Sequence, residues 1–303
     1  MIDQTIGLVG LGAMGRGVAN NLVAKGYQLV AYDVRPEVKD WVEERGAAFA
    51  PSLKELGRQC GMVISFVVND AQTEQILFGE GGLTESMKPD STFIACSTMP
   101  PAYVAALGAR LAAHSIHLLD APVTGGAAGA AKGSLTVMVA GAKQVFEQSK
   151  PVLEAFSARI YYMGEKPGAG AQVKVINQLL CGVHLAAAGE ALALAKRQGL
   201  PLDITRELLC SGSANSWMLG DRGPRMIAEA FGEVTSAVDI FVKDMGLVLD
   251  AARASRFSAP LASAAYNAFL SVSGSGMGSW DDSAVMCDYQ RDPYQGEIPK
   301  PVK

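Results

Sequence analysis

The feature that most constrains this chain is a glycine-rich turn, GLGAMG, which stands directly after a short apolar run and directly before a helical pattern. In a turn of this spacing Gly10 permits the tight bend, Gly12 lets the backbone approach a pyrophosphate, and Gly15 lets the next helix pack on the strand. Ala13 and Met14 complete the turn, and the helix N-terminus favours the phosphate charge. The sequence therefore predicts a dinucleotide-binding βαβ unit.

A carboxylate at the end of the second apolar run indicates which dinucleotide is bound. Asp33 lies about twenty residues beyond the glycines, where it can accept the adenosine ribose hydroxyls and repel a 2'-phosphate. Arg35 leaves an alternative open, because its guanidinium could either bind that phosphate or lie in solvent. We predict NAD as the cofactor, with NADP as the less favoured choice.

Short apolar runs alternate with helical patterns from residue 1 to about 164. Most of these runs lack an inward and outward alternation, which is typical of parallel strands covered on both faces by crossover helices. The order predicts an α/β fold with an N-terminal Rossmann domain, a doubly wound parallel sheet. The predicted strands are TIGLVG, YQLVAYD, MVISFVV, STFIACS, IHLLDAP, LTVMVAG and RIYYMG.

Beyond Gly168 only helical patterns follow. The segment GEKPGAG between the two regions contains a proline and three glycines, which favour a break between elements. We predict a NAD-binding Rossmann domain at 1–166 and an all-α substrate and oligomerisation domain at 167–303, with Gly168 and Gly170 as a hinge. The stretch DYQRDPYQGEIPKPVK receives no function. The predicted helices are at about 170–198, 203–212, 216–229, 236–254 and 258–273.

Composition narrows the classes of partner. A formal net charge of -4 offers no basic surface for a nucleic acid, and no uninterrupted apolar run reaches the roughly 18 residues that a membrane span needs. The five cysteines are scattered without metal-binding or disulfide-like spacing, which favours a cytoplasmic protein without a metal. We expect a small-molecule ligand, and a homodimer or homotetramer, because the long apolar helix needs more cover than a small domain gives.

A dehydrogenase needs a proton-transfer group beside its cofactor, and the sequence offers Lys174. Asn177 and Gln178 follow at i+3 and i+4, so one helix face carries an ammonium and two amides. This stripe is either a solvated edge, with the lysine stem along apolar surface, or a face that lines a cleft. The residues alone leave both interpretations open. The three histidines lie far from other candidate acids, and we expect them to be structural.

Two segments that follow predicted strands offer further polar groups. In DAPVTGG, Thr124 supplies a hydroxyl, and Gly125 and Gly126 supply backbone amides that suit a substrate carboxylate. In CSTMPP, Thr98 follows the end of another strand. Taken singly, each segment also fits an ordinary turn.

Four segments, present together and in order, resemble the β-hydroxyacid dehydrogenase family, which includes 3-hydroxyisobutyrate dehydrogenase and tartronate semialdehyde reductase. The resemblance covers nearly the whole chain and implies an NAD-dependent dehydrogenase of small hydroxy acids. It implies that Lys174 is the general acid/base and that Asn177 helps to position the substrate. We predict that Gln178, on the same helix face, binds the substrate as well. The segments are GLVGLGAMGRGVANNLVAKG, DAPVTGGAAGAAKGSLTVMVAG, GAGAQVKVINQ and FVKDMGLVLD.

The same resemblance implies that Thr124 and the two glycines after it contact the substrate carboxylate, and that Thr98 and Lys243 lie against the cofactor. Spacing alone gives Lys243 a different partner, an i,i+4 ion pair with Asp239. The chain also departs from the family pattern. Thr124 stands where many members have serine, Gln178 where many have a second asparagine, and Cys96 where an acidic or amide residue is common.

Three segments of the helical region resemble the L-threonate dehydrogenases of this family, which oxidise the 2-hydroxyl of a four-carbon sugar acid to give 2-oxo-tetronate. Asn215 and Ser216 in the first segment offer hydrogen bonds to a polyol. We predict oxidation of L-threonate, with 3-hydroxyisobutyrate dehydrogenase, tartronate semialdehyde reductase and a non-catalytic NAD-binding module as alternatives. The segments are ANSWMLGDRGPRM, SAVDIFVKDMGLVLD and DDSAVMCDY.

Overall fold

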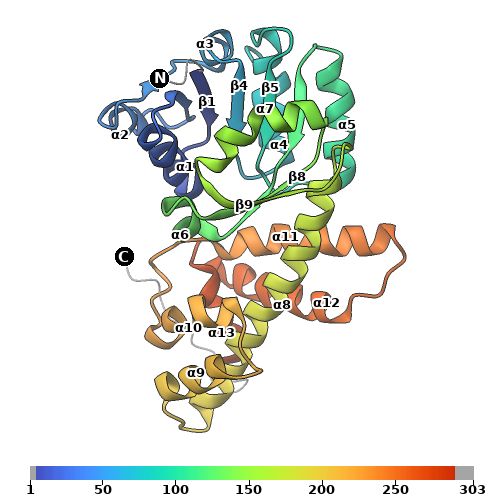
Figure 1. Cartoon of the computed structure of the whole chain (residues 1–303). Helices are drawn as coiled ribbons and strands as arrows, with labels where there is room; N and C mark the ends of the chain where they lie inside the picture. The colour runs from blue at the N-terminus through green and yellow to red at the C-terminus, as the bar shows by residue number, and fades with distance from the viewer. Residues whose placement is uncertain (1–4, 291–303) are drawn as a thin grey trace. The chain divides into compact units, whose positions relative to one another are not determined.

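A computed structural model describes residues 5–290. The chain divides into two compact units, and the division falls between Lys174 and Val175, inside one long helix. The first unit alternates strands and helices, and the second is helical (Figure 1). The predicted fold class, a Rossmann-type α/β region followed by an all-α region, is confirmed.

Six strands form the main sheet of the first unit. They are β1 (Thr5–Val9), β2 (Gln28–Tyr32), β3 (Ala48–Phe49), β4 (Met62–Ser65), β5 (Thr92–Ala95) and β6 (His117–Asp120). All neighbours are parallel, in the order β3-β2-β1-β4-β5-β6. The order reverses between β1 and β4, and sheets of this kind bind ligands beyond the carboxyl ends of the strands at such a reversal.

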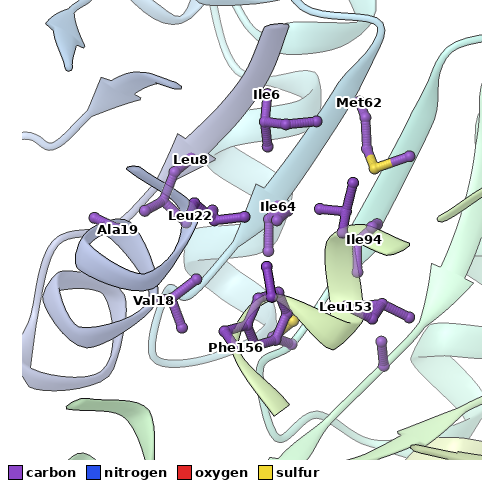
Figure 2. Close-up of a cluster of buried hydrophobic side chains, with 14 of the residues drawn as sticks. Ile6, Leu8, Val18, Ala19, Leu22, Met62, Ile64, Ile94, Leu153 and Phe156 are labelled. Atoms are coloured by element: carbon purple, nitrogen blue, oxygen red, sulfur yellow. The ribbon is translucent and has the colours of Figure 1, made fainter. Parts of the chain in front are cut away.

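Both faces of this sheet are buried, which explains why its strands appear in the sequence as unbroken apolar runs. In β4, Met62 and Ile64 belong to one buried cluster and Val63 to another. Figure 2 shows part of the first cluster, where Leu22 of a covering helix lies near Leu8. The first cluster includes residues of α1 (Ala13–Ala24), α2 (Val38–Glu43) and α7 (Lys143–Glu154), and the second those of α3 (Leu53–Gln59), α4 (Asp70–Phe78) and α5 (Pro101–Ala112).

A second sheet accounts for the last two predicted strands of the first unit. LTVMVAG and RIYYMG form β8 (Leu135–Val139) and β9 (Ser157–Tyr162), which pair in parallel with each other in a separate sheet. One isolated antiparallel bridge, between Ala140 after β8 and Asp120 of β6, joins this sheet to the main sheet. The two-residue strand β7 (Val123–Thr124) pairs antiparallel with β8. The sequence analysis missed β3 and β7 because two residues are too few to show a period. The short helices η1 (Leu83–Glu85) and α6 (Gly126–Ala131) complete this unit.

The five helices predicted for the second region are all present, within two residues of the predicted bounds. They are α8 (Ala169–Arg197), α9 (Leu202–Ser211), α10 (Trp217–Ala228), α11 (Val238–Ala254) and α12 (Pro260–Val272). Three short helices follow: η2 (Ser273–Met277), η3 (Asp282–Val285) and α13 (Met286–Gln290). Most of the C-terminal stretch for which no function was predicted lies beyond residue 290, outside the described residues.

The 29-residue helix α8 is long and apolar enough to cross a membrane by length and composition, the one such helix within residues 5–290. Half of its most apolar stretch is buried inside the protein. The core helix of a soluble protein meets the same criteria, so α8 by itself assigns the chain to no membrane.

A carboxylate at the end of β6 fixes the start of α8. Asp120 Oδ2 accepts hydrogen bonds from the backbone N–H groups of Gly168 at 2.9 Å and Ala171 at 3.0 Å. Negative charge is favourable at a helix N-terminus, where these N–H groups have no partner within the helix. Gly170 lies in the same junction, where a Cβ atom would be 2.5 Å from the carbonyl oxygen of Met138. Gly170 therefore serves close packing at this junction, and a domain hinge at Gly168 and Gly170 stays a prediction.

Gly170→Ala should lower the free energy of unfolding by about 1–3 kcal/mol, because the added methyl group must displace packed backbone. Gly246→Ala is the matched control, since Gly246 also lies inside a helix and a Cβ atom there would meet nothing within 4 Å. That substitution should raise stability by up to about 1 kcal/mol through helix propensity. Urea unfolding of the two variants measures the difference, and equal stabilities would contradict the packing role of Gly170.

Candidate active site

The glycine turn has the geometry that its spacing predicts. Gly10 has a φ of +92°, and a Cβ atom there would lie 2.8 Å from the carbonyl oxygen of Phe66. A Cβ atom on Gly15 would lie 1.9 Å from the carbonyl oxygen of Gly10. Gly12 differs, because a Cβ atom there would meet nothing within 4 Å, and no side chain caps the helix that begins after it. Open space above uncapped backbone N–H groups fits a pyrophosphate.

Asp33 is hydrogen-bonded to the backbone of this turn. Its Oδ2 accepts the backbone N–H of Leu11 at 2.7 Å, and Arg35 Nε donates to Oδ1 at 2.9 Å. Arg35 Nη2 also donates to Oδ2 at 3.0 Å and to the carbonyl oxygen of Leu11 at 3.1 Å. Burial alone would raise the pKa of Asp33, but the hydrogen bonds from Arg35 and Leu11 outweigh it and lower the pKa. Arg35 thus binds the carboxylate instead of lying free in solvent.

The turn that contains Thr124 leads into α6, which packs against α1, the helix that follows the glycine turn. Thr124 ends β7, Gly125 has a φ of +123°, and α6 begins at the next residue, Gly126. Asn21 of α1 donates through Nδ2 to the carbonyl oxygen of Ala130 in α6 at 2.8 Å. A Cβ atom on Gly17 of α1 would lie 2.6 Å from the Ala130 carbonyl carbon. The structure therefore brings together two motifs that are more than a hundred residues apart in sequence.

Thr98 and three other polar residues of the first unit lie at or just beyond the carboxyl ends of strands in the main sheet. Thr98 comes three residues after β5, and Ser97 Oγ donates to the carbonyl oxygen of Val67 at 2.6 Å, which links the ends of β5 and β4. Asp120 ends β6, where burial raises its pKa to about 6 despite three backbone hydrogen bonds. Burial and the Asp120 charge raise the pKa of Cys96 as well. Cys96 is thereby kept as a neutral thiol.

Lys174 lies in the second turn of α8, three residues after Ala171, whose N–H binds Asp120. Its side chain is buried, with the residue 7 % exposed. That burial disfavours the interpretation of the polar stripe as a solvated edge.

Asn177 and Gln178 take part in a polar network of the second unit. Asn177 Nδ2 donates to Gln178 Oε1 at 2.8 Å, and Gln178 Nε2 donates to Asp244 Oδ2 at 2.5 Å. The Nζ of Lys243 lies 2.7 Å from Asp244 Oδ1. The i,i+4 ion pair with Asp239 suggested by spacing is wrong, because the ion pair of Lys243 is with the adjacent Asp244. Asp239 instead accepts a hydrogen bond from Ser273 Oγ at 2.6 Å.

Asp244 is a polar residue of this network that the sequence analysis missed. It is 3 % exposed and lies in α11 among the buried residues Phe241, Met245 and Val248. The signal was available, because positions 241, 244, 245 and 248 form the i, i+3, i+4, i+7 stripe that faces a core. A carboxylate on such a stripe indicates a specific partner.

The structure gives the remaining two predicted substrate residues a local setting. Ser216 is the N-cap of α10, and its Oγ accepts the backbone N–H of Leu219 at 3.0 Å. Asn215 is exposed in the segment before that cap. A cap explains a serine at this position on structural grounds, and substrate binding by either residue stays a prediction.

The two regions match two family models. Residues 5–164 match the NAD binding domain of 6-phosphogluconate dehydrogenase, and residues 168–288 match the NAD-binding region of NADP-dependent 3-hydroxyisobutyrate dehydrogenase. The chain belongs to the 3-hydroxyisobutyrate dehydrogenase family. It is thus a nicotinamide-dependent dehydrogenase of hydroxy acids.

Relatives within this dehydrogenase family match over almost their whole length. The L-threonate dehydrogenase of Cupriavidus necator is 45% identical over 94% of this chain and 96% of its own. That of Escherichia coli is 42% identical over 93% of each chain. A crystal structure described as 3-hydroxyisobutyrate dehydrogenase from Salmonella typhimurium is 43% identical, with a TM-score of 0.89 over 94% of this chain and 99% of its own.

The dehydrogenase should show a pH dependence of stability that comes from Asp120. The folded-state pKa of about 6 lies above the ordinary value of 3.8, so the native state retains a proton that the unfolded chain releases. The contribution of this group is fully present below about pH 4 and is lost as the pH rises through about 6. The free energy of unfolding of the wild type minus that of Asp120→Asn should fall by about 2–3 kcal/mol over this range. Urea unfolding at stepped pH measures it, and a flat difference would show that Asp120 titrates normally.

Proposed function

We propose that this dehydrogenase oxidises L-threonate at its 2-hydroxyl, with NAD as the cofactor and Lys174 as the general acid/base. The observation that carries the substrate is that five relatives, each 40–45% identical over 93–94% of this chain, are named L-threonate dehydrogenases. The product is the 2-oxo acid, 2-oxo-tetronate.

In this reaction the carbon that bears the hydroxyl loses a hydride and the oxygen loses a proton. The nicotinamide ring, when bound, accepts the hydride. Lys174, as the neutral amine, accepts the hydroxyl proton, and in the reverse direction the ammonium returns it. The anchoring of α8 by Asp120 supports this role, because it fixes the first turn of the helix, one turn before Lys174. Thr98 and Lys243 would lie against the cofactor.

The substrate carboxylate would bind to Thr124 and to the backbone amides of Gly125 and Gly126. Positive φ values at both glycines permit a close backbone approach that other residues rarely allow. Asn177 and Gln178 would contact the hydroxyl-bearing part of the molecule. Asn215 and Ser216 would contribute further hydrogen bonds to a polyol.

We also infer a cytoplasmic homo-oligomer, with the domain division near residue 166 that the sequence predicts. Support for the oligomer comes from large apolar side chains that are exposed in the single chain, among them Leu194, Ile204 and Leu208 on α8 and α9. No residue of α9 is buried.

Lys174→Ala should reduce kcat with L-threonate by about 10²–10⁴-fold, the usual contribution of a general acid/base, and leave NADH affinity nearly unchanged. Lys196→Ala is the matched control, because Lys196 lies in the same helix with its side chain 50 % exposed and paired with Glu229. Steady-state kinetics and NADH fluorescence titration give the two readouts. Turnover near the wild-type rate would overturn the assignment.

The substrate is tested with a panel of L-threonate, D-threonate, 3-hydroxyisobutyrate and D-glycerate, and of tartronate semialdehyde in the reducing direction. L-Threonate should have the highest kcat/KM. A higher value for 3-hydroxyisobutyrate would instead favour the activity named for the Salmonella typhimurium structure.

The cofactor preference is tested by binding of NADH and NADPH to wild type, Asp33→Asn and Arg35→Ala. NADH should bind the wild type more tightly by about tenfold or more, which corresponds to roughly 1.4 kcal/mol. Asp33→Asn should lose this preference for NADH, because the charge that repels the 2'-phosphate of NADPH is gone. Arg35→Ala should strengthen the preference, because Asp33 then keeps its charge without the guanidinium as a partner. Tighter NADPH binding that disappears in Arg35→Ala would show that Arg35 binds the 2'-phosphate.

A further inference from the structure

The polar network of the second unit has a fixed direction. Asp244 Oδ2 accepts from Gln178 Nε2, and an ionised carboxylate has only acceptors to offer. The other oxygen, Oδ1, lies 2.7 Å from Lys243 Nζ without the alignment of a hydrogen bond. Gln178 must therefore turn its NH₂ group toward Asp244, which leaves Oε1 as the end that faces Asn177.

This direction passes on to Asn177. Because Gln178 presents Oε1, Asn177 turns its own NH₂ group toward it and donates at 2.8 Å. The same Nδ2 donates to Cys181 Sγ at 3.3 Å, so both of its hydrogens are used. Asn177 Oδ1 accepts no hydrogen bond from the described residues, and the side chain is partly exposed. The end of the amide that Asn177 can offer to a ligand is thus an acceptor.

We propose that Asp244 is a positioning residue that, through Gln178, makes Asn177 an acceptor for a second hydroxyl group of the substrate. This inference rests on the proposed function, in which Lys174 removes the proton of the first hydroxyl. Lys174 and Asn177 are three residues apart in α8 and therefore lie on the same face of the helix, one turn from each other. The substrate class is then a hydroxy acid that carries another hydroxyl close to the carbon that is oxidised.

The length of Gln178 matters for this arrangement. An asparagine at this position would be one methylene shorter. Gln178 spans from α8 to a carboxylate 66 residues away in sequence while it also bonds Asn177. The length of the Gln178 side chain therefore allows it to bond both Asp244 and Asn177.

Asp244→Asn should reverse the direction of the network. The amide introduced at this position would turn its carbonyl oxygen toward the Lys243 ammonium and its NH₂ group toward Gln178, so that Gln178 would present NH₂ to Asn177. Asn177 would then offer NH₂ to the substrate. Asp250→Asn is the matched control, because Asp250 lies in the same helix with its carboxylate 67 % exposed and paired with Arg253.

The probes are L-threonate analogues in which the hydroxyl at C3 or at C4 is replaced by hydrogen or by fluorine. Fluorine can accept a hydrogen bond but cannot donate one. A fluorine substituent is therefore unfavourable next to a carbonyl oxygen and favourable next to an NH₂ group. The measurement is the ratio of kcat/KM for the fluoro analogue to that for the deoxy analogue. Its intrinsic electronic part is common to all variants and cancels between them. At one of the two positions the ratio should rise about tenfold from wild type to Asp244→Asn and stay unchanged in Asp250→Asn.

An unchanged ratio in Asp244→Asn, with equal losses on all substrates, would reduce Asp244 to a structural role and overturn the inference. Gln178→Met supplies a second variant of similar length that cannot transmit a direction, and its ratio should move the same way. NADH binding checks that each variant is folded. The wild-type panel separates the two proposals: if a different acid with a second hydroxyl is oxidised, only L-threonate is wrong and its analogues take over the test. If the oxidised acid has no second hydroxyl, both proposals are wrong.

Discussion

One buried carboxylate joins the parallel sheet to the helix on which the proposed chemistry depends. Asp120 is 1 % exposed, and it ends β6 while it binds the first N–H groups of α8. The burial of a charge is unfavourable unless donors surround it, and the N-terminus of a helix provides such donors together with its dipole. Because the first turn of α8 is fixed by Asp120, the position of Lys174 one turn later follows from the position of the sheet edge.

Much of this architecture could be predicted from the sequence, because the features that define it are determined by residues close together in the chain. The glycine turn, the buried parallel strands and the helices of the second unit each have a period or a spacing that neighbouring residues determine. The second sheet was missed, because β8 is as apolar as the strands of the main sheet, and only the pairing of distant residues separates them. The role of Gly170 was missed for the same reason, since the atoms that exclude a side chain there belong to Met138 and Asp120.

The candidate site likewise has features that the sequence predicts and features that it does not. Gly10, Gly12 and Gly15 have the predicted geometry, whereas the ion pairs of Lys243 and Arg35 are with carboxylates one and two residues away, at spacings that the sequence analysis did not single out as pairs. A helix spacing of four residues suggested Asp239 for Lys243, but the adjacent Asp244 is the residue beside its ammonium. The polar residues of the second unit form a chain in which each side chain determines the orientation of the next, and a sequence alone does not reveal such an order.

The contact between α1 and α6 has a consequence for how this protein can change in evolution. Gly17 and Asn21 of α1 hold this helix against α6, which begins two residues after Thr124. There is no room for a larger side chain at Gly17. A substitution that moves one helix must move the other. The affinity for the cofactor and the shape of the loop proposed to hold the substrate carboxylate therefore share one contact, and selection on either property acts on both.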